Sequence, residues 1–187
     1  KYWNIEEKCF VHKIDNLKTS GINEYEKILD KKLNQSIKQR LISDVPIGAF
    51  LSGGLDSSAV VSAMSELSNM PVETHTIGYS ENAYDESNAA REVARHLGTN
   101  HHEFILSPND AKSIIPNLSE LYCEPFADSS QIPTYFLAKQ TKRNVTVSLS
   151  GDGGDELFGG YEHHSRILKL QNLSRILPFP FPKIASL

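Results

Sequence analysis

A glycine-rich turn that carries hydroxyl groups and one acidic side chain lies at residues 52–58, in the string Ser-Gly-Gly-Leu-Asp-Ser-Ser. An apolar run precedes it and a predicted helix follows it. A helix N-terminus offers unpaired backbone N–H groups and a partial positive charge, and glycines let the backbone approach an anion closely. With the hydroxyls of Ser52, Ser57 and Ser58, this arrangement predicts a phosphate or pyrophosphate site. The alternative is a plain strand–turn–helix connection capped by a Ser or Asp side chain.

Asp56 adds an argument for a cation at this turn. A carboxylate beside a phosphate is repulsive unless a cation lies between them, and Mg²⁺ is commonly held by one or two carboxylates plus phosphate oxygens. Asp56 therefore predicts Mg²⁺, and helix capping is a compatible role. The string lacks the Gly-Lys-Ser/Thr end of a Walker A loop. It also lacks Gly-x-Gly-x-x-Gly spacing, which argues against a dinucleotide cofactor.

A second glycine-rich string, with three acidic side chains, spans residues 150–161 as Ser-Gly-Asp-Gly-Gly-Asp-Glu-Leu-Phe-Gly-Gly-Tyr. It follows an apolar predicted strand, and open α/β sheets form ligand sites where their strands end. Asp152, Asp155 and Glu156 are too close together to stay ionised comfortably without a cation. This is a second, independent argument for Mg²⁺. The alternative, a calcium-type or merely solvated loop, lacks the ligand spacing of an EF-hand.

The elements that position these strings alternate between helix and strand. Pro116 is expected to break or kink one of the predicted helices, and the Pro- and Phe-rich tail at 177–182 is expected to be irregular. Such alternation predicts an α/β fold with a mostly parallel, twisted sheet and helices on both faces. The predicted helices are residues 23–41, 56–68, 84–97, 107–123 and 131–143, and the predicted strands are residues 47–51, 72–79, 101–106 and 145–149.

Composition excludes several classes of protein. The 187 residues suffice for one domain with a sizeable core. A net charge of −4 argues against a nucleic-acid surface, and no apolar run is long enough to span a membrane. Two cysteines without CxxC spacing favour a reducing cytoplasm. The pairs His101-His102 and His163-His164 are weak metal candidates, because metal ligands need a specific spacing. On a strand, neighbouring side chains point to opposite faces, so His101 and His102 could not easily share an ion.

Taken together, the strings resemble those of a known family. Residues 52–57 resemble the Ser-Gly-Gly-x-Asp-Ser pyrophosphate loop of the N-type ATP pyrophosphatases. Residues 150–161 resemble the Ser-Gly-Glu/Asp-Gly-x-Asp-Glu-x-Phe-x-Gly-Tyr motif of asparagine synthetases and β-lactam synthetases. Further agreement lies at residues 40–46, 96–103 and 124–128. The resemblance implies a Rossmann-like fold of the adenine-nucleotide alpha-hydrolase type.

The resemblance also implies roles for individual residues. Asp56 and Asp155 would hold Mg²⁺. Asp152 would lie near the reacting centre, where many members carry the longer Glu. The residues implied in binding ATP are Leu51, Ser52, Gly53, Gly54, Asp56, Ser57, Ile77, Ser150 and Gly151.

The activity implied by the resemblance is that of an ATP-dependent amide ligase. The side-chain carboxylate of aspartate is adenylated with release of pyrophosphate, and ammonia then displaces AMP to give asparagine. Residues 1–22 are expected to be a linker from a missing glutaminase domain that supplies the ammonia. Residues 23–187 are expected to be the synthetase domain without its C-terminal helical part, so that the isolated piece does little chemistry.

Two rival functions stay open at this point, as does a homodimer. One is a related amidotransferase or β-lactam-synthetase-like enzyme that acts on a different acceptor acid. The other is a non-catalytic module that only binds ATP. The retention of three acidic residues in the second string argues against the second rival, because nucleotide binding alone does not need them.

Overall fold

The computed structural model describes residues 21–80, 85–124 and 127–176. Contacts divide the chain into two units, residues 1–43 and 44–187. The described part of the first unit is a single helix, α2 (Ile22–Arg40), which agrees with the helix predicted at 23–41. Arg40 donates from its guanidinium to the carbonyl and hydroxyl of Ser36, which ties the last turn of the helix together. The predicted boundary between a linker and a domain near residue 22 stays a prediction.

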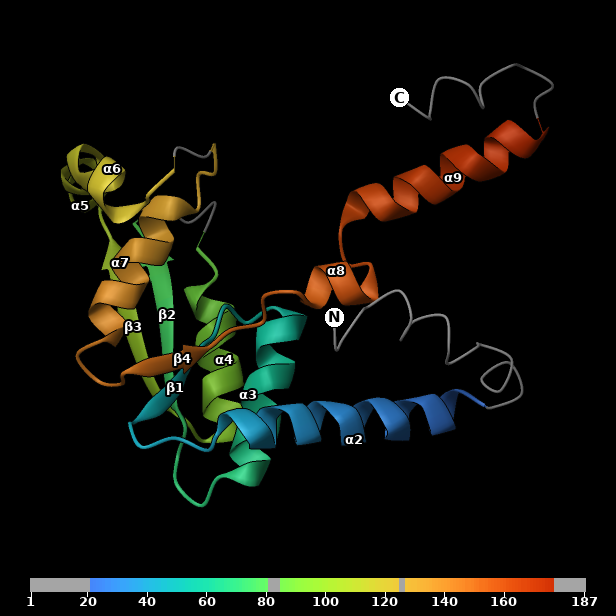
Figure 1. Cartoon of the computed structure of the whole chain (residues 1–187), viewed down its shortest axis with the longest axis horizontal. Helices are drawn as coiled ribbons and strands as arrows, with labels where there is room; N and C mark the ends of the chain where they lie inside the picture. The colour runs from blue at the N-terminus through green and yellow to red at the C-terminus, as the bar shows by residue number, and fades with distance from the viewer. Residues whose placement is uncertain (1–20, 81–84, 125–126, 177–187) are drawn as a thin grey trace, which may run out of the picture. The chain divides into compact units, whose positions relative to one another are not determined.

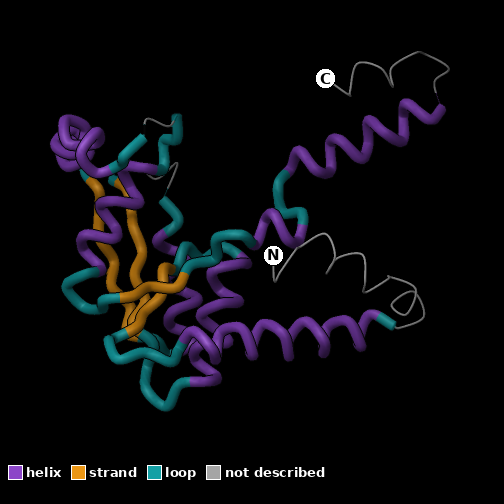
Figure 2. The backbone as a smooth tube through the Cα atoms, viewed as in Figure 1, coloured by secondary structure: helices purple, strands orange, loops and turns teal. Residues whose placement is uncertain are grey.

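The second unit is built on a parallel sheet (Figures 1 and 2). All pairings between its described strands are parallel, in the order β3-β2-β1-β4. Gly48 of the central strand pairs with Glu73 on one side and with Ser148 on the other. The predicted α/β class is therefore confirmed. The strands are β1 (Ile47–Phe50), β2 (Glu73–Tyr79), β3 (Asn100–Leu106) and β4 (Val147–Leu149).

Helices cover both faces of this sheet, as predicted (Figure 1). On one face lie α3 (Leu55–Leu67) and α4 (Ser87–Leu97), which contact each other and the strands. The other face carries α7 (Gln131–Thr141). Two adjacent residues of β3 show the division, because neighbours on a strand point to opposite faces. Glu103 pairs with Arg91 of α4, whereas His102 contacts Asn144, just after α7.

The apolar core of this unit lies between the sheet and its helices. Buried side chains come from the inner sides of α3 and α4 and from strands whose two faces are both covered, as expected for a parallel sheet. Among the most buried apolar residues are Ala49, Leu51, Val61, Met64, Ala90 and Ala94.

The helix predicted at 107–123 is three shorter pieces: α5 (Pro108–Ile114), the 3₁₀ turn η3 (Ile115–Asn117) and α6 (Leu118–Leu121). Pro116 causes the division, since it lacks the N–H that a continuous α-helix needs. Its place in η3 therefore confirms the expected break. At the start of α5, Ser107 and Asp110 form a reciprocal capping box.

Several boundaries differ from the sequence prediction. Helix α4 begins at Ser87 rather than at residue 84, and residues 81–84 lie outside the described part. Strand β4 begins at Val147, because the Val145 N–H still bonds to the Thr141 carbonyl at the end of α7. Two helices were not predicted, α8 (Gly154–Phe158) and α9 (Glu162–Ile176). The tail predicted to be irregular, 177–182, is not among the described residues. No helix in the described ranges is both long and apolar enough to cross a bilayer.

Candidate functional site

The strand order brings the two glycine-rich strings to one place. Strand β1 lies between β2 and β4. From β1, the chain first adds β2 and β3 on one side of the sheet and later adds β4 on the other side, so the strand order reverses at β1. Ligands of open α/β sheets bind outside the carboxyl ends of the strands at such a point. The string at 52–58 directly follows β1, and the string at 150–161 directly follows β4. The two predicted motifs therefore lie side by side at this edge of the sheet.

The first string forms a tight turn into α3. Gly53 has a φ of +80°, a conformation that L side chains rarely adopt. A side chain at Gly53 would also meet the backbone of Ala89 and Ala90 at the start of α4. The residue preceding α3 is Gly54, and no side chain caps this helix end. The alternative of a Ser or Asp cap is therefore wrong, and the end of α3 keeps the backbone donors that an anion needs.

Hydroxyl groups hold this turn in shape. The Ser52 and Ser57 hydroxyl oxygens lie 2.9 Å apart, and the Ser52 N–H donates to the Ser57 oxygen over 3.2 Å. The Gly54 N–H donates to the Ser52 hydroxyl over 3.2 Å, while the Ser57 hydroxyl donates to the Gly54 carbonyl over 3.3 Å. Ser57 is buried. Ser57 therefore stabilises the turn from inside, whereas Ser52 is exposed.

The second string packs directly against the first. An added Cβ at Gly151 would meet the backbone nitrogen of Ser57 at 2.8 Å. An added Cβ at Gly154 would collide with the carboxylate of Asp56. Only a residue without a side chain fits at either position. Gly154 is the first residue of α8, so this helix begins beside Asp56. Asp155 is the second residue of α8.

Within the second string, two hydrogen bonds orient acidic side chains. The Ser150 hydroxyl donates to Asp152 Oδ2 over 2.9 Å. The Tyr161 hydroxyl donates to Glu156 Oε1 over 2.6 Å. This second bond lowers the pKa of Glu156 and raises the pKa of Tyr161 to about 12. The contact of Glu156 with Tyr161 was not predicted, because a spacing of five residues matches no regular element.

Leu51 and Ile77, two of the residues implied in binding ATP, belong to neighbouring strands or their ends. Leu51 directly follows β1 and is 1% exposed, and its N–H donates to the His75 carbonyl over 2.9 Å. Ile77 lies in β2, two residues beyond His75, and is half-buried. Leu51 is thus chiefly a core residue, and it directly precedes the first string. Their roles toward a nucleotide stay predictions.

The described residues contain no group of three or more His, Cys, Asp or Glu side chains placed to hold a metal ion. His101 contacts the Thr74 hydroxyl, and His102 contacts Glu73, so the two adjacent imidazoles have separate partners. Mg²⁺ needs only one or two carboxylates when phosphate and water supply its other ligands. Asp56 lies against Gly154, and Asp155 follows Gly154 in the chain. Asp56 and Asp155 fit that requirement.

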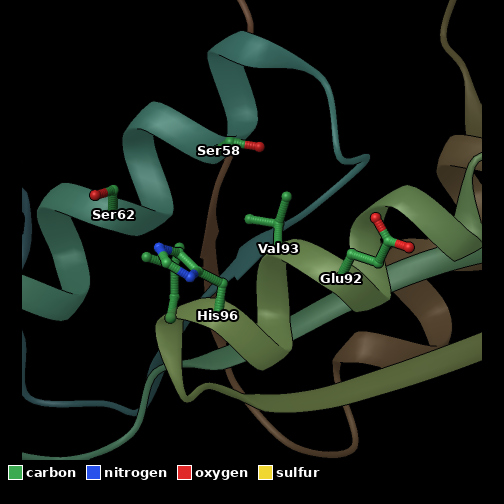
Figure 3. A pocket seen from close by; sticks show the side chains of 6 residues that line it. Ser58, Ser62, Glu92, Val93 and His96 are labelled. Carbon is green, nitrogen blue, oxygen red and sulfur yellow. The ribbon is translucent and has the colours of Figure 1, made fainter.

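A pocket of about 430 Å³ lies between α3 and α4 (Figure 3). Ser58, whose hydroxyl is predicted to contribute to the phosphate site, lines this pocket, and none of the other residues predicted to bind ATP or Mg²⁺ does. Its walls combine hydroxyl, carboxylate, imidazole and apolar groups, and the sequence analysis did not predict it. The lining residues are Ser58, Ser62, Glu92, Val93, His96 and Leu97.

The strand order and the packing of the two strings define an α/β protein with glycine-rich loops at the reversal point of a parallel sheet. Residues 29–186 match the family model described as asparagine synthase. The chain belongs to the asparagine synthase family.

Two curated relatives illustrate the relationship. The chain is 40% identical over 166 residues to a provisionally named asparagine synthetase (glutamine-hydrolysing) of Methanocaldococcus jannaschii, covering 83% of this chain and 32% of the relative. It is also 40% identical over 141 residues to asparagine synthetase (glutamine-hydrolysing) 1 of Bacillus subtilis, covering 75% and 22%. The chain therefore spans a third or less of the length of these relatives. Among solved structures, it matches the NH₃-dependent NAD synthetase of Campylobacter jejuni with a TM-score of 0.49 and 17% identity, over 72% of this chain and 60% of that one.

Proposed function

We propose that this chain is the ATP-binding synthetase part of an amide ligase that converts aspartate to asparagine. The observation that carries the proposal is the close packing of the two glycine-rich strings at the reversal point of the sheet. Membership of the asparagine synthase family supports the choice of reaction. The reducing cytoplasm is its proposed location, on the basis of cysteine usage.

The first string is proposed to bind the pyrophosphate end of ATP. The uncapped N-terminus of α3 supplies backbone donors, and the exposed Ser52 hydroxyl adds another. Asp56 and Asp155 would hold Mg²⁺, which when bound neutralises charge on the phosphates. Leu51, Ile77, Ser150 and Gly151 are proposed to border the adenosine part.

The proposed reaction has two steps. A carboxylate oxygen of aspartate attacks the α-phosphorus of ATP, and the bond from that phosphorus to pyrophosphate breaks. Ammonia then attacks the acyl carbon, and the bond from that carbon to AMP breaks. We place Asp152 where it holds the incoming amine and accepts its proton, a role suited to a carboxylate fixed by a neighbouring hydroxyl.

Calorimetric titration of the chain with ATP, with and without Mg²⁺, tests the binding part of the proposal. Affinity should lie between micromolar and millimolar and should rise with Mg²⁺. Asp56→Ala and Asp155→Ala should each lower the affinity measured with Mg²⁺ by tenfold or more, equivalent to about 1.4 kcal/mol. Binding that is indifferent to Mg²⁺ and to both substitutions would contradict the metal assignment.

Pyrophosphate release tests the choice of acceptor. Pyrophosphate should be released when ATP, ammonia and aspartate are present. It should not be released when glutamate or an N-substituted amino acid replaces aspartate. Faster release with another acid would favour the related ligases considered from the sequence. ATP binding without release on any acid, in the full-length protein, would favour a non-catalytic nucleotide-binding module.

A further inference from the structure

The chain folds back on itself after α8. Helix α8 has only five residues, ends at Gly159 with a φ of +70°, and has no side-chain cap at its N-terminus. The Gly160 N–H then donates to the Asp155 carbonyl over 3.0 Å. The Asp155 carboxylate occupies the space that a side chain at residue 160 would need. Asp155 is therefore covered on one side by the returning chain.

A hydrogen bond closes this fold-back. Tyr161 donates its hydroxyl to Glu156 Oε1 over 2.6 Å, and Glu156 is the residue next to Asp155. The bond is short because its acceptor is ionised, and such bonds are stronger than neutral ones. His163 stacks on the Tyr161 ring at 5.1 Å between centroids, and His164 meets the ring edge-on at 5.6 Å. The phenol is thus held from two sides.

Without this bond, little would fix α8. An isolated helix of one or two turns is unstable in water, because few hydrogen bonds offset the ordering of its backbone. No residue of α8 is buried. Contacts that hold it include the approach of Gly154 to Asp56 at one end, and the Gly160 N–H bond to the Asp155 carbonyl and the Tyr161–Glu156 bond at the other.

We propose that Tyr161 and Glu156 are positioning residues that hold Asp155 in the orientation needed to bind Mg²⁺ with ATP. Neither side chain needs to touch the metal or the nucleotide. The inference rests on the proposed function, because it takes Asp155 to be a metal ligand. It assigns a reason to the Glu and Tyr of the second string that the sequence analysis left without one.

The test compares the affinity for ATP with and without Mg²⁺, by calorimetry on the full chain. Tyr161→Phe and Glu156→Ala should each lower the affinity measured with Mg²⁺ by about three- to tenfold. The affinity measured in EDTA should not change. Glu156→Gln keeps an oxygen acceptor for the Tyr161 hydroxyl and should retain most of the affinity. The double variant Tyr161→Phe/Glu156→Ala should bind no more weakly than either single variant, since both remove one bond.

Glu162→Ala is the matched control. It removes an equally charged, exposed carboxylate just beyond Tyr161, one that pairs with Arg166 instead. This control should bind ATP as the unchanged chain does.

Equal loss of affinity with and without Mg²⁺ in Tyr161→Phe would overturn the inference, because the bond would then have only a general structural role. Full Mg²⁺-dependent affinity in Tyr161→Phe, together with its loss in Asp155→Ala, would overturn the inference and leave the proposed function standing. An unchanged chain whose ATP binding ignores Mg²⁺ would instead defeat the proposed metal site itself.

Discussion

At the scale of single residues, Gly154 is the position where the two strings exclude any side chain. An added methyl group would collide with the Asp56 carboxylate, so one of the two strings would have to shift. Gly154→Ala should therefore lower the affinity for ATP with Mg²⁺ by tenfold or more in a calorimetric titration, while the chain stays folded. Gly21→Ala is the control, because nothing lies within 4 Å of its added Cβ. Unchanged affinity in Gly154→Ala would mean that the strings need not touch for binding.

A second prediction at this scale concerns His75, which lies in the middle of β2 and is fully buried. Burial lowers its pKa from the ordinary 6.5 to about 4. Between pH 6.5 and pH 4 the unfolded chain binds more protons than the folded chain. The free energy of unfolding that depends on a neutral His75 is therefore fully present above pH 6.5 and is lost as the pH falls toward 4. Denaturant unfolding should show a loss of about 2 kcal/mol at pH 5 relative to pH 7.5.

His75→Phe is the variant that isolates this effect. The ring should still stack between His102 and Phe104, whose centroids lie 5.0 and 6.3 Å from that of His75. His101 and Glu73 are present in both proteins, so only the part of the pH dependence due to His75 disappears. A variant that loses as much stability between pH 7.5 and pH 5 as the unchanged chain would show that another group causes the effect.

At the scale of elements, the sequence predicts the strands better than their order. Strand β1 is a short apolar run covered on both faces, and such a run carries no alternation that would fix a neighbour or a register. The position of β1 between β2 and β4 depends on contacts between distant segments. The sequence could therefore predict that Asp56 and Asp155 gather at one edge, but not that Gly151 and Gly154 touch the first string.

The helices that the sequence analysis missed lack the usual signal. Five residues, as in α8, are too few to show a helical period. In α9, the apolar residues do not form a buried face: Ile167, Leu168 and Leu170 are all exposed. A pattern of period 3.6 arises from packing against a core, and none of these three side chains has such packing.

Helix α5 gives a prediction at this scale. Ser107 accepts from the Asp110 N–H, and Asp110 in turn accepts from the Ser107 N–H. Ser107→Ala should lower the free energy of unfolding by about 1 kcal/mol, the usual value of such a cap, without changing the affinity for ATP. Ser113→Ala, within the same helix, should cost less. Equal costs for both serines in denaturant unfolding would show that the capping box adds nothing.

At the scale of the whole molecule, ATP should stabilise segments that are far apart in the sequence. A ligand at a hundredfold excess over its Kd stabilises the folded chain by about 2.7 kcal/mol, which corresponds to about a hundredfold slower exchange of the amides that open with the site. With Mg·ATP, amides at 52–58 and at 150–158 should slow together in hydrogen-exchange mass spectrometry. Those of α6 should change little. Protection of the first segment alone would show that the second string takes no part in binding.

The pairing of β1 with β4 also bears on the order in which the chain can fold during synthesis. Gly48 pairs with Ser148, one hundred residues later, whereas β1, β2 and β3 succeed one another along the chain. A chain leaving the ribosome N-terminus first can assemble these three strands early. The second string, which follows β4 and is proposed to bind ATP with the first, is then still untranslated. The nucleotide therefore cannot act as a template for the early folding of this chain, and its binding reports that the last strand has been added.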